Sequence, residues 1–173
     1  MVEKELLVRS LAEVREQLLG ELEGLGFEAV NAKPSKDEWG VAQVCHHLYL
    51  AERAFTQGIL YGLNKADGQK VEAKPIQALT DRSMKKQAPP IVIPSEDPME
   101  IPQILQLLSE ARTELLQVLN TLKDDSLLET KSAKHPVVGY VPIYQWVESI
   151  YLHELRHIDQ IKEIKVLIHS KKI

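Results

Sequence analysis

Cysteine is nearly absent from this chain of 173 residues, because Cys45 is the only one. A single cysteine cannot form an intramolecular disulfide, which makes a reducing cytoplasm the expected location. Long apolar runs are also missing, so no segment is expected to span a membrane. The N-terminal residues lack the basic and apolar regions of a secretion signal. We therefore expect a cytoplasmic protein with no membrane partner.

Aromatic residues make up only 5% of the sequence, and basic residues do not cluster. The net charge is −4, and Lys and Arg are scattered apart from Lys85-Lys86 and Lys171-Lys172. This distribution is unlike a nucleic-acid-binding surface, so no nucleic-acid partner is expected. The abundant residues are Leu, Glu, Lys, Gln and Ala, which have high helix propensity. The composition therefore favours an all-α protein.

Four segments carry apolar residues at the three- and four-residue spacing of an amphipathic helix. These predicted helices cover about residues 3–24, 39–63, 98–122 and 142–168. A chain of this length is about right for one domain and can bury a core of its own. The sequence therefore predicts a four-helix bundle that forms a single domain over residues 1–173.

Turn residues and capping signals separate these helices. Gly24 is expected to end the first helix. The third helix has a start signal, with Asp97 as the cap, Pro98 at the first helical position and Glu100 able to close a capping box. The connection between the second and third helices is long, and we expect a short extra helix at about residues 76–87 within it.

His153 and His157 are four residues apart, so on a helix they lie on one face. The surrounding apolar stripe turns that face towards the core. A buried imidazole needs a partner, and a divalent cation bound by two ring nitrogens would be one. The stripe consists of Ile143, Trp146, Val147, Ile150, Ile161, Ile164 and Ile168.

A metal site that does chemistry usually has three protein ligands and an open position. Among the other histidines, His169 lies near the C-terminus and His135 precedes a proline in a loop. His46 is expected to face water, whereas His47 lies roughly 90° from the centre of its apolar stripe. In an up-down bundle the second and fourth helices run parallel, which could bring His47 to the histidine pair. A histidine at such a boundary is most often a surface residue, so the residues alone leave its role open.

The same residues carry a resemblance to a known family. The second helix begins with WGVAQVCHHL over residues 39–48, the last loop contains HPVVG over residues 135–139, and the last helix contains HELRHIDQI over residues 153–161. These stretches resemble the W-S-x-x-x-x-x-H-H-L, H-P-x-x-G and H-E-x-x-H-x-x-Q-I segments of the DinB-like (YfiT-related) metalloenzymes of bacteria. Gly40 stands where the family usually has Ser or Thr, which weakens the helix start.

The resemblance implies a four-helix bundle with a histidine triad of His47, His153 and His157. It implies zinc or nickel in that site with water completing the coordination. Members of the wider superfamily use glutathione, mycothiol or bacillithiol in transferase and isomerase reactions, so a low-molecular-weight thiol is an implied cofactor. A homodimer is common in the family, although no residue of this chain indicates one.

Residues 153–157 also spell H-E-x-x-H, the motif of zincin proteases. A zincin is disfavoured because only 16 residues follow His157, and because Gln160 and Glu163 stand where the metzincin extension requires Gly and His. Glu154 lies towards the core, where it could orient a ligand histidine, pair with a cation of a neighbouring helix, or act as a general base.

Gln43 and Gln160 each lie one turn from a predicted ligand. Either could hydrogen-bond to a ligand imidazole or be an ordinary polar residue at the core boundary. Cys45 is expected to be a buried structural thiol.

The favoured function is a metal-dependent enzyme with a His₃ site that acts on a small molecule, as a thiol S-transferase or a hydrolase. The alternatives are a non-catalytic metal-binding bundle with a role in stress response, and a plain bundle with hydrogen-bonded core histidines. Whether the chain is an enzyme stays open, and so do its substrate and the choice of zinc or nickel, because imidazole suits both metals.

Overall fold

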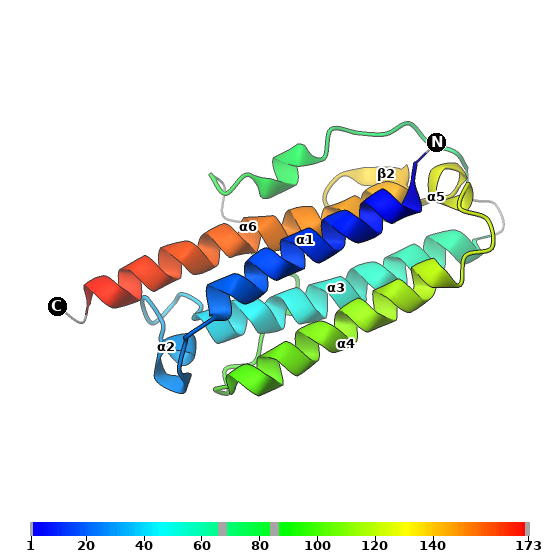
Figure 1. Cartoon of the computed structure of the whole chain (residues 1–173). Helices are drawn as coiled ribbons and strands as arrows, with labels where there is room; N and C mark the ends of the chain where they lie inside the picture. The colour runs from blue at the N-terminus through cyan, green and yellow to red at the C-terminus, as the bar shows by residue number, and fades with distance from the viewer. Residues whose placement is uncertain (1, 66–68, 84–86, 172–173) are drawn as a thin grey trace.

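The computed structural model describes residues 2–65, 69–83 and 87–171. Four long helices lie side by side in one bundle (Figure 1). The predicted all-α four-helix bundle is therefore confirmed. The long helices are α1 (Lys4–Leu22), α3 (Val41–Asn64), α4 (Ile101–Asn120) and α6 (Ile143–Ser170). The short helices are α2 (Phe27–Asn31), η1 (Gln77–Thr80), η2 (Pro90–Val92) and α5 (Leu127–Thr130).

The bundle does not have the up-down topology assumed above for His47. Figure 1 shows α3 and α4 running in one direction and α1 and α6 in the other, so α3 and α6 are antiparallel. The hydrophobic core agrees, because residues from the start of α3 and of α4 pack with residues from the end of α1 and of α6. A parallel α3–α4 pair explains the long connection, because the chain must return over about 36 Å, the length of a 24-residue helix, before α4 begins.

The predicted short helix within residues 76–87 is present but shorter than predicted. Within the described part of this range, only η1, a 3₁₀ helix, is helical. Beyond it, Asp81 accepts hydrogen bonds from the Ser83 backbone N–H at 2.8 Å and from the Ser83 hydroxyl at 3.0 Å. Such local bonds compete with helical ones and end the helix. Residues 84–86 of the predicted range lie outside the described residues.

The predicted start of the third helix is about three residues too early. α4 begins at Ile101, with Glu100 as the N-cap residue and Pro102 in the first turn. Asp97 is engaged earlier, because the Ser95 hydroxyl donates to its carboxylate at 2.9 Å. The first helix ends close to the prediction, since α1 stops at Leu22 and Gly24 takes a left-handed φ of 74°.

The segment before the last helix was expected to be a loop, but it contains a hairpin. Strand β1 (Ser132–His135) pairs antiparallel with β2 (Gly139–Pro142). Gly139 has a φ of 76°, which permits the turn between the strands. Strands of four residues are too short to give a recognisable alternation of apolar and polar residues.

The surroundings of Gly40 explain why this position departs from the Ser or Thr of the family pattern. A Cβ at this position would lie 2.7 Å from the Ala32 carbonyl oxygen, so a serine or threonine would not fit without a shift. Glycine has no side chain to accept from the first N–H groups of α3. Gln43 supplies the reciprocal bond of a capping box, because its Oε1 accepts a hydrogen bond from the Gly40 N–H at 3.2 Å.

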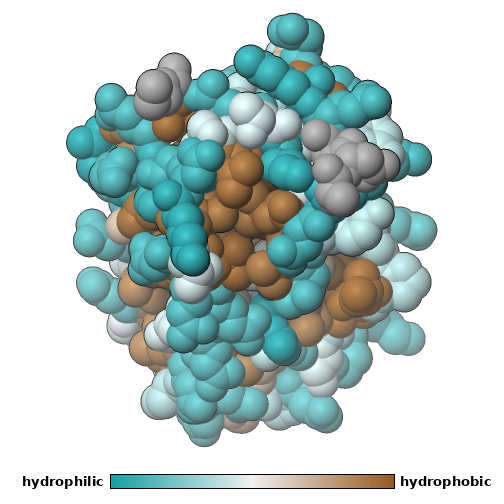
Figure 2. All heavy atoms as spheres, turned by 90° about the vertical axis from the view of Figure 1, so that its right-hand side faces the viewer, coloured by the Kyte–Doolittle hydropathy of each residue, from teal (hydrophilic) through white to brown (hydrophobic). Residues whose placement is uncertain are grey.

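None of the described helices combines the length and apolar composition needed to span a bilayer. The space-filling view in Figure 2 looks onto the end of the bundle that carries the N-terminus, α5 and β2 in Figure 1. Apolar residues gather in the middle of this end and hydrophilic residues surround them.

Candidate metal centre

Three histidines meet between α3 and α6. His47 comes from α3, and His153 and His157 come from successive turns of α6. The His153 Nε2 lies 3.3 Å from the His47 Nε2 and 3.1 Å from the His157 Nε2. Ligand-type nitrogens of all three side chains lie within 4.8 Å of one another. The antiparallel packing thus brings together the three residues proposed from the sequence.

The outer nitrogens of two of these rings have fixed partners. The His47 Nδ1 lies 2.7 Å from the Val92 carbonyl oxygen, and the His157 Nδ1 lies 2.7 Å from the Gln160 Oε1. Because both partners are acceptors, each Nδ1 carries the proton and each Nε2 presents a lone pair. A single proton on the His153 Nε2 can satisfy only one of these two lone pairs. A cation between the three nitrogens would satisfy all of them, so the donor set fits a metal ion.

The surroundings keep the imidazoles neutral. His47 and His157 are buried, and His153 is half-buried. Burial lowers the pKa of His157 to about 3, with a further contribution from His47. Desolvation and then the neighbouring imidazoles lower the pKa of His153 well below the ordinary histidine value. Neutral imidazole is the form that binds metals, so these rings are ready to act as ligands at pH 7.

Glu154 pairs with cations of neighbouring helices, which was one of its three expected roles. Its carboxylate is 2% exposed. The Oε1 accepts from the Arg15 Nε at 2.6 Å, and the Oε2 accepts from the Arg112 Nη2 at 2.9 Å. Both oxygens therefore face guanidinium groups of α1 and α4.

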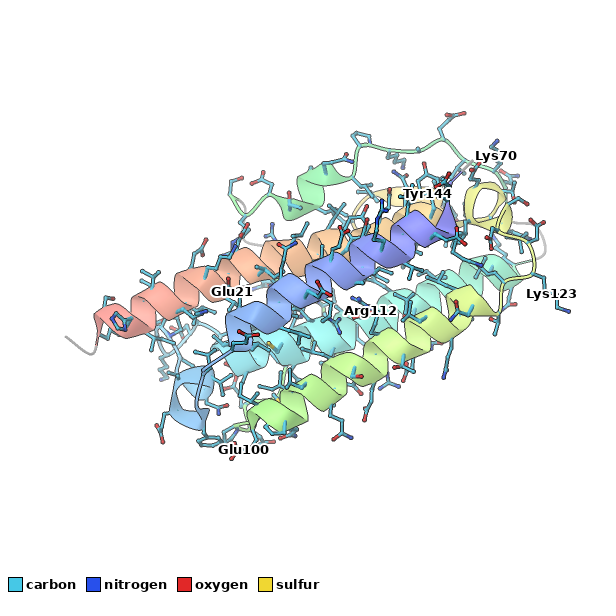
Figure 3. All side chains as sticks on the ribbon, viewed as in Figure 1. Glu21, Lys70, Glu100, Arg112, Lys123 and Tyr144 are labelled. Atoms are coloured by element: carbon cyan, nitrogen blue, oxygen red, sulfur yellow. The ribbon has the colours of Figure 1, made fainter. Side chains whose placement is uncertain are left out.

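Glu52 completes an ionic cluster that sequence reasoning missed. Its Oε2 accepts from the Arg15 Nη2 at 2.6 Å, and its Oε1 accepts from the Arg112 Nε at 2.6 Å. Arg112 points from α4 into the middle of the bundle in Figure 3. We call these four residues the ion-pair layer: Arg15, Glu52, Arg112 and Glu154.

The ion-pair layer separates two apolar clusters of the core. One cluster contains Leu18, Val44, Leu108 and Ile161, and the other contains Leu11, Ile59, Leu115 and Ile150. Each long helix contributes one charged residue to this layer, and on each helix that residue lies between a residue of the first cluster and a residue of the second. A charged residue within an apolar stripe, such as Arg15 between Leu11 and Leu18, was the available signal.

The two glutamines differ in their surroundings. Gln160 contacts a triad histidine, as one of its two expected roles required. Gln43 contacts none, because its side chain bonds to the Gly40 N–H, the Ser95 carbonyl and Glu96. Gln43 therefore belongs to the start of α3.

The remaining candidates lie outside the triad. His46 is half-buried rather than fully in water, and its Nδ1 accepts from the Ser95 N–H at 3.0 Å. Burial raises the pKa of the Cys45 thiol to about 12, as expected for an unreactive structural cysteine.

His135 lies at the end of β1 and is 1% exposed. Its ring stacks on Phe55 with centroids 5.4 Å apart, and Phe55 also meets His153 edge-on at 5.8 Å. The His135 Nδ1 accepts from the Val137 N–H at 3.2 Å. Its Nε2 has no hydrogen-bond partner, and it is the only such buried side-chain nitrogen or oxygen within residues 2–65, 69–83 and 87–171. Burial lowers the pKa of His135 to about 4.

These features define an all-α bundle with a buried histidine cluster suited to a divalent cation. Residues 10–161 match the DinB superfamily. The chain is also 31% identical over 153 residues to the uncharacterized protein YuaE of Bacillus subtilis strain 168. The aligned residues cover 88% of this chain and 93% of YuaE. The chain belongs to the DinB superfamily, and the resemblance found in the sequence is confirmed.

Solved structures share the fold. YfiT from Bacillus subtilis, described as a probable metal-dependent hydrolase with an unusual four-helix bundle topology, superposes with a TM-score of 0.61 at 19% identity, over 98% of this chain and 91% of YfiT. A conserved protein from Enterococcus faecalis superposes with a TM-score of 0.65 at 13% identity, over 98% of this chain and 99% of that protein. The four-helix bundle protein TT2238 superposes with a TM-score of 0.62 at 17% identity, over 93% of this chain and 99% of TT2238.

Proposed function

We propose that this protein is a metal-dependent enzyme that binds one divalent cation through His47, His153 and His157 and acts on a small molecule. The observation that supports the proposal is the convergence of three Nε2 atoms whose rings are kept neutral by burial. Three imidazoles are a ligand set typical of catalytic zinc sites, which keep one coordination position open. Imidazole also suits nickel.

The chain's own residues supply orientation and a dry environment. The Val92 carbonyl and the Gln160 amide oxygen hold two rings with their Nε2 atoms turned inward. A cation bound there would supply Lewis acidity, lowering the pKa of an oxygen or sulfur nucleophile so that its anion attacks at neutral pH. Glu154 acts in this proposal through the ion-pair layer rather than as the general base, because both its oxygens already accept from arginines.

The proposed reaction class is thiol S-transfer with a low-molecular-weight thiol, or metal-assisted hydrolysis. The hydrolase option is supported by the description of YfiT, which shares the fold at 19% identity. The buried, unpaired Cys45 is compatible with the cytoplasm that we propose as the location. A homodimer remains a prediction.

A second candidate function is metal binding without catalysis. The small size of the cavity beside His153, about 10 Å³, favours it because so small a space does not hold a substrate. Turnover of thiol or ester substrates by the metal-loaded protein would exclude this candidate. Full metal occupancy with no turnover would support it.

The first experiment is elemental analysis of protein purified without a histidine tag, beside His47→Ala and the control His46→Ala. We expect about one zinc or nickel per chain in the wild type and in the His46 variant, and loss of the metal in the His47 variant. Retained stoichiometric metal in His47→Ala would contradict the triad. A thiol-transfer and esterase screen of the loaded protein then separates the two functions.

A further inference from the structure

A hollow of about 330 Å³ lies where the second half of α3 meets the β1–β2 hairpin and the start of α6. The helix and the hairpin are close here, because a Cβ at Gly62 on α3 would lie 2.9 Å from the Ala133 Cβ on β1. The volume is within the range of about 300–1,000 Å³ that is usual for small-molecule sites. Trp146 lines the hollow and precedes His153 by two turns of α6, roughly 10 Å. The hollow is therefore a place on the protein separate from the metal centre.

Aromatic side chains gather around this hollow. In the described part of the chain, the exposed residues among Phe, Tyr and Trp are Phe27, Tyr61 and Tyr140, and the two tyrosines line the hollow. Tyr61 is 67% exposed and Tyr140 is 50% exposed. The buried Trp146 is anchored, because its Nε1 donates to the Ala133 carbonyl at 3.2 Å. A fixed indole with two exposed phenol rings around the same space is suited to contact with a flat aromatic ring.

The polar groups at the hollow favour an anion. Lys134 on β1 is paired directly with Tyr140 on β2, so their Cβ atoms lie about 4.5–5.5 Å apart on one face of the hairpin. Lys134 is exposed, and its ammonium group makes no hydrogen bond or ion pair within residues 2–65, 69–83 and 87–171. Lys65 also lines the hollow, whereas no Asp or Glu is among its described lining residues. In a chain with a net charge of −4, this is a locally basic site.

We propose that the hollow binds a small molecule that joins a flat aromatic ring to a carboxylate. The ring packs on Trp146 and Tyr61, and the carboxylate accepts hydrogen bonds from the Lys134 ammonium and the Tyr140 hydroxyl. A carboxylate has two oxygens for these two donors, and the ammonium makes the stronger, charge-assisted bond. The inference goes beyond the proposed function, because this binding requires none of the triad histidines.

The direct test is an NMR titration of the wild-type protein with cinnamate, a flat aromatic carboxylate. The two indole N–H resonances are assigned with Trp39→Phe. We expect a saturable shift of the Trp146 resonance and no shift of the Trp39 resonance. The neutral analogue cinnamyl alcohol and the aliphatic carboxylate hexanoate should each bind at least about fivefold more weakly. Absence of a saturable shift would overturn the inference, and so would equal affinity for either analogue.

The same titration with chelator present separates this site from the metal centre. We expect an unchanged affinity for cinnamate, because its carboxylate is held by Lys134 and Tyr140. Loss of binding on removal of metal would mean that the carboxylate binds at the triad, and the inference would be wrong. Failure of the protein to bind metal at all would contradict the proposed function and leave this site untouched.

Lys134→Gln tests the charged contact, and Lys123→Gln is the control with the same loss of charge. Lys123 lies on the loop after α4 and points away from the bundle in Figure 3. We expect the affinity for cinnamate to fall about tenfold in the first variant and to keep the wild-type value in the second. Tyr61→Ala should lower it roughly two- to tenfold through loss of the ring contact. Wild-type affinity in Lys134→Gln, or an equal loss in the control, would contradict the assigned site.

Discussion

The Gln160 side chain lies one helical turn beyond His157 and its Oε1 is 2.7 Å from the Nδ1 of that ring. The contact selects the tautomer in which the His157 Nε2 is free to bind a metal. It also gives a physical reason for the glutamine in the H-E-x-x-H-x-x-Q-I segment, because the glutamine makes a hydrogen bond with the second histidine of the pair.

Replacing Gln160 with leucine is therefore expected to weaken metal binding. Loss of a partner behind a ligand histidine costs about 10- to 100-fold in affinity. Competition with a chromophoric chelator measures the zinc affinity. The control is Gln43→Leu, since Gln43 contacts the start of α3 and no triad histidine. If both variants bind zinc as tightly as the wild type, the Gln160 contact has no role in the centre.

The amphipathic spacing of the sequence was sufficient to predict the four helices and the inward orientation of His153 and His157. It could not predict the relative directions of the helices, because α3 has the same apolar stripe whether it runs parallel or antiparallel to α6. The direction follows from the long connection, which carries the chain back along the bundle before α4. His47 was assigned through the family resemblance, since its angle on the helix is that of a boundary residue.

Neither the ion-pair layer nor the hairpin was predicted from the sequence. Arg15 interrupts an apolar stripe, but its pairing with Glu52 depends on the packing of helices far apart in the chain. The hairpin depends on a glycine turn and on pairing between strands of four residues, such as Ala133 with Val141. Both are tertiary features that local periodicity does not record.

Arg112 tests the energetic role of the ion-pair layer. Arg112→Met leaves Glu52 and Glu154 with one guanidinium between them, and breaking a buried pair in this way costs about 3–5 kcal/mol. The matched control is Arg53→Met, because Arg53 pairs with Glu114 on the surface, where side chains are 47% and 40% exposed. That change should cost less than about 1 kcal/mol. Urea unfolding measures both, and equal losses would mean that the buried layer has no special role.

His135 predicts a pH dependence of stability. Its unfolded form binds a proton below about pH 6.5, whereas burial lowers the folded pKa to about 4. The unfolded state therefore takes up more protons in this window, and the contribution to stability is complete above pH 6.5 and is lost as the pH falls towards 4, by roughly 1.4 kcal/mol per pH unit.

His135→Phe removes this titrating group and keeps an aromatic ring against Phe55 and Trp146. Between pH 7 and 4, its free energy of unfolding should fall less than that of the wild type. The measurement is chemical denaturation at several pH values with chelator present, so that metal loss does not contribute. The triad histidines titrate in both proteins, and the difference between the two curves isolates His135. Parallel curves would show that its folded pKa is close to that of the unfolded chain.

Two helical glycines give opposite predictions for the same substitution. A Cβ at Gly58 on α3 would lie 2.3 Å from the Trp146 ring, whose Nε1 is held by the Ala133 carbonyl at 3.2 Å. The ring cannot withdraw without breaking that bond, so Gly58→Ala should destabilise the protein by about 1–3 kcal/mol through overpacking. A Cβ at Gly20 on α1 meets no atom within 4 Å. Gly20→Ala should therefore stabilise the protein by up to about 1 kcal/mol, the difference in helix propensity.

Thermal unfolding of both variants against the wild type separates packing from propensity. A rise in melting temperature for Gly58→Ala would mean that Trp146 does not press against α3. Because Trp146 also packs on His135 with centroids 4.9 Å apart, a displaced indole would disturb the aromatic contacts that continue through Phe55 to His153. Gly58→Ala should consequently weaken zinc binding as well, whereas Gly20→Ala should leave zinc affinity unchanged.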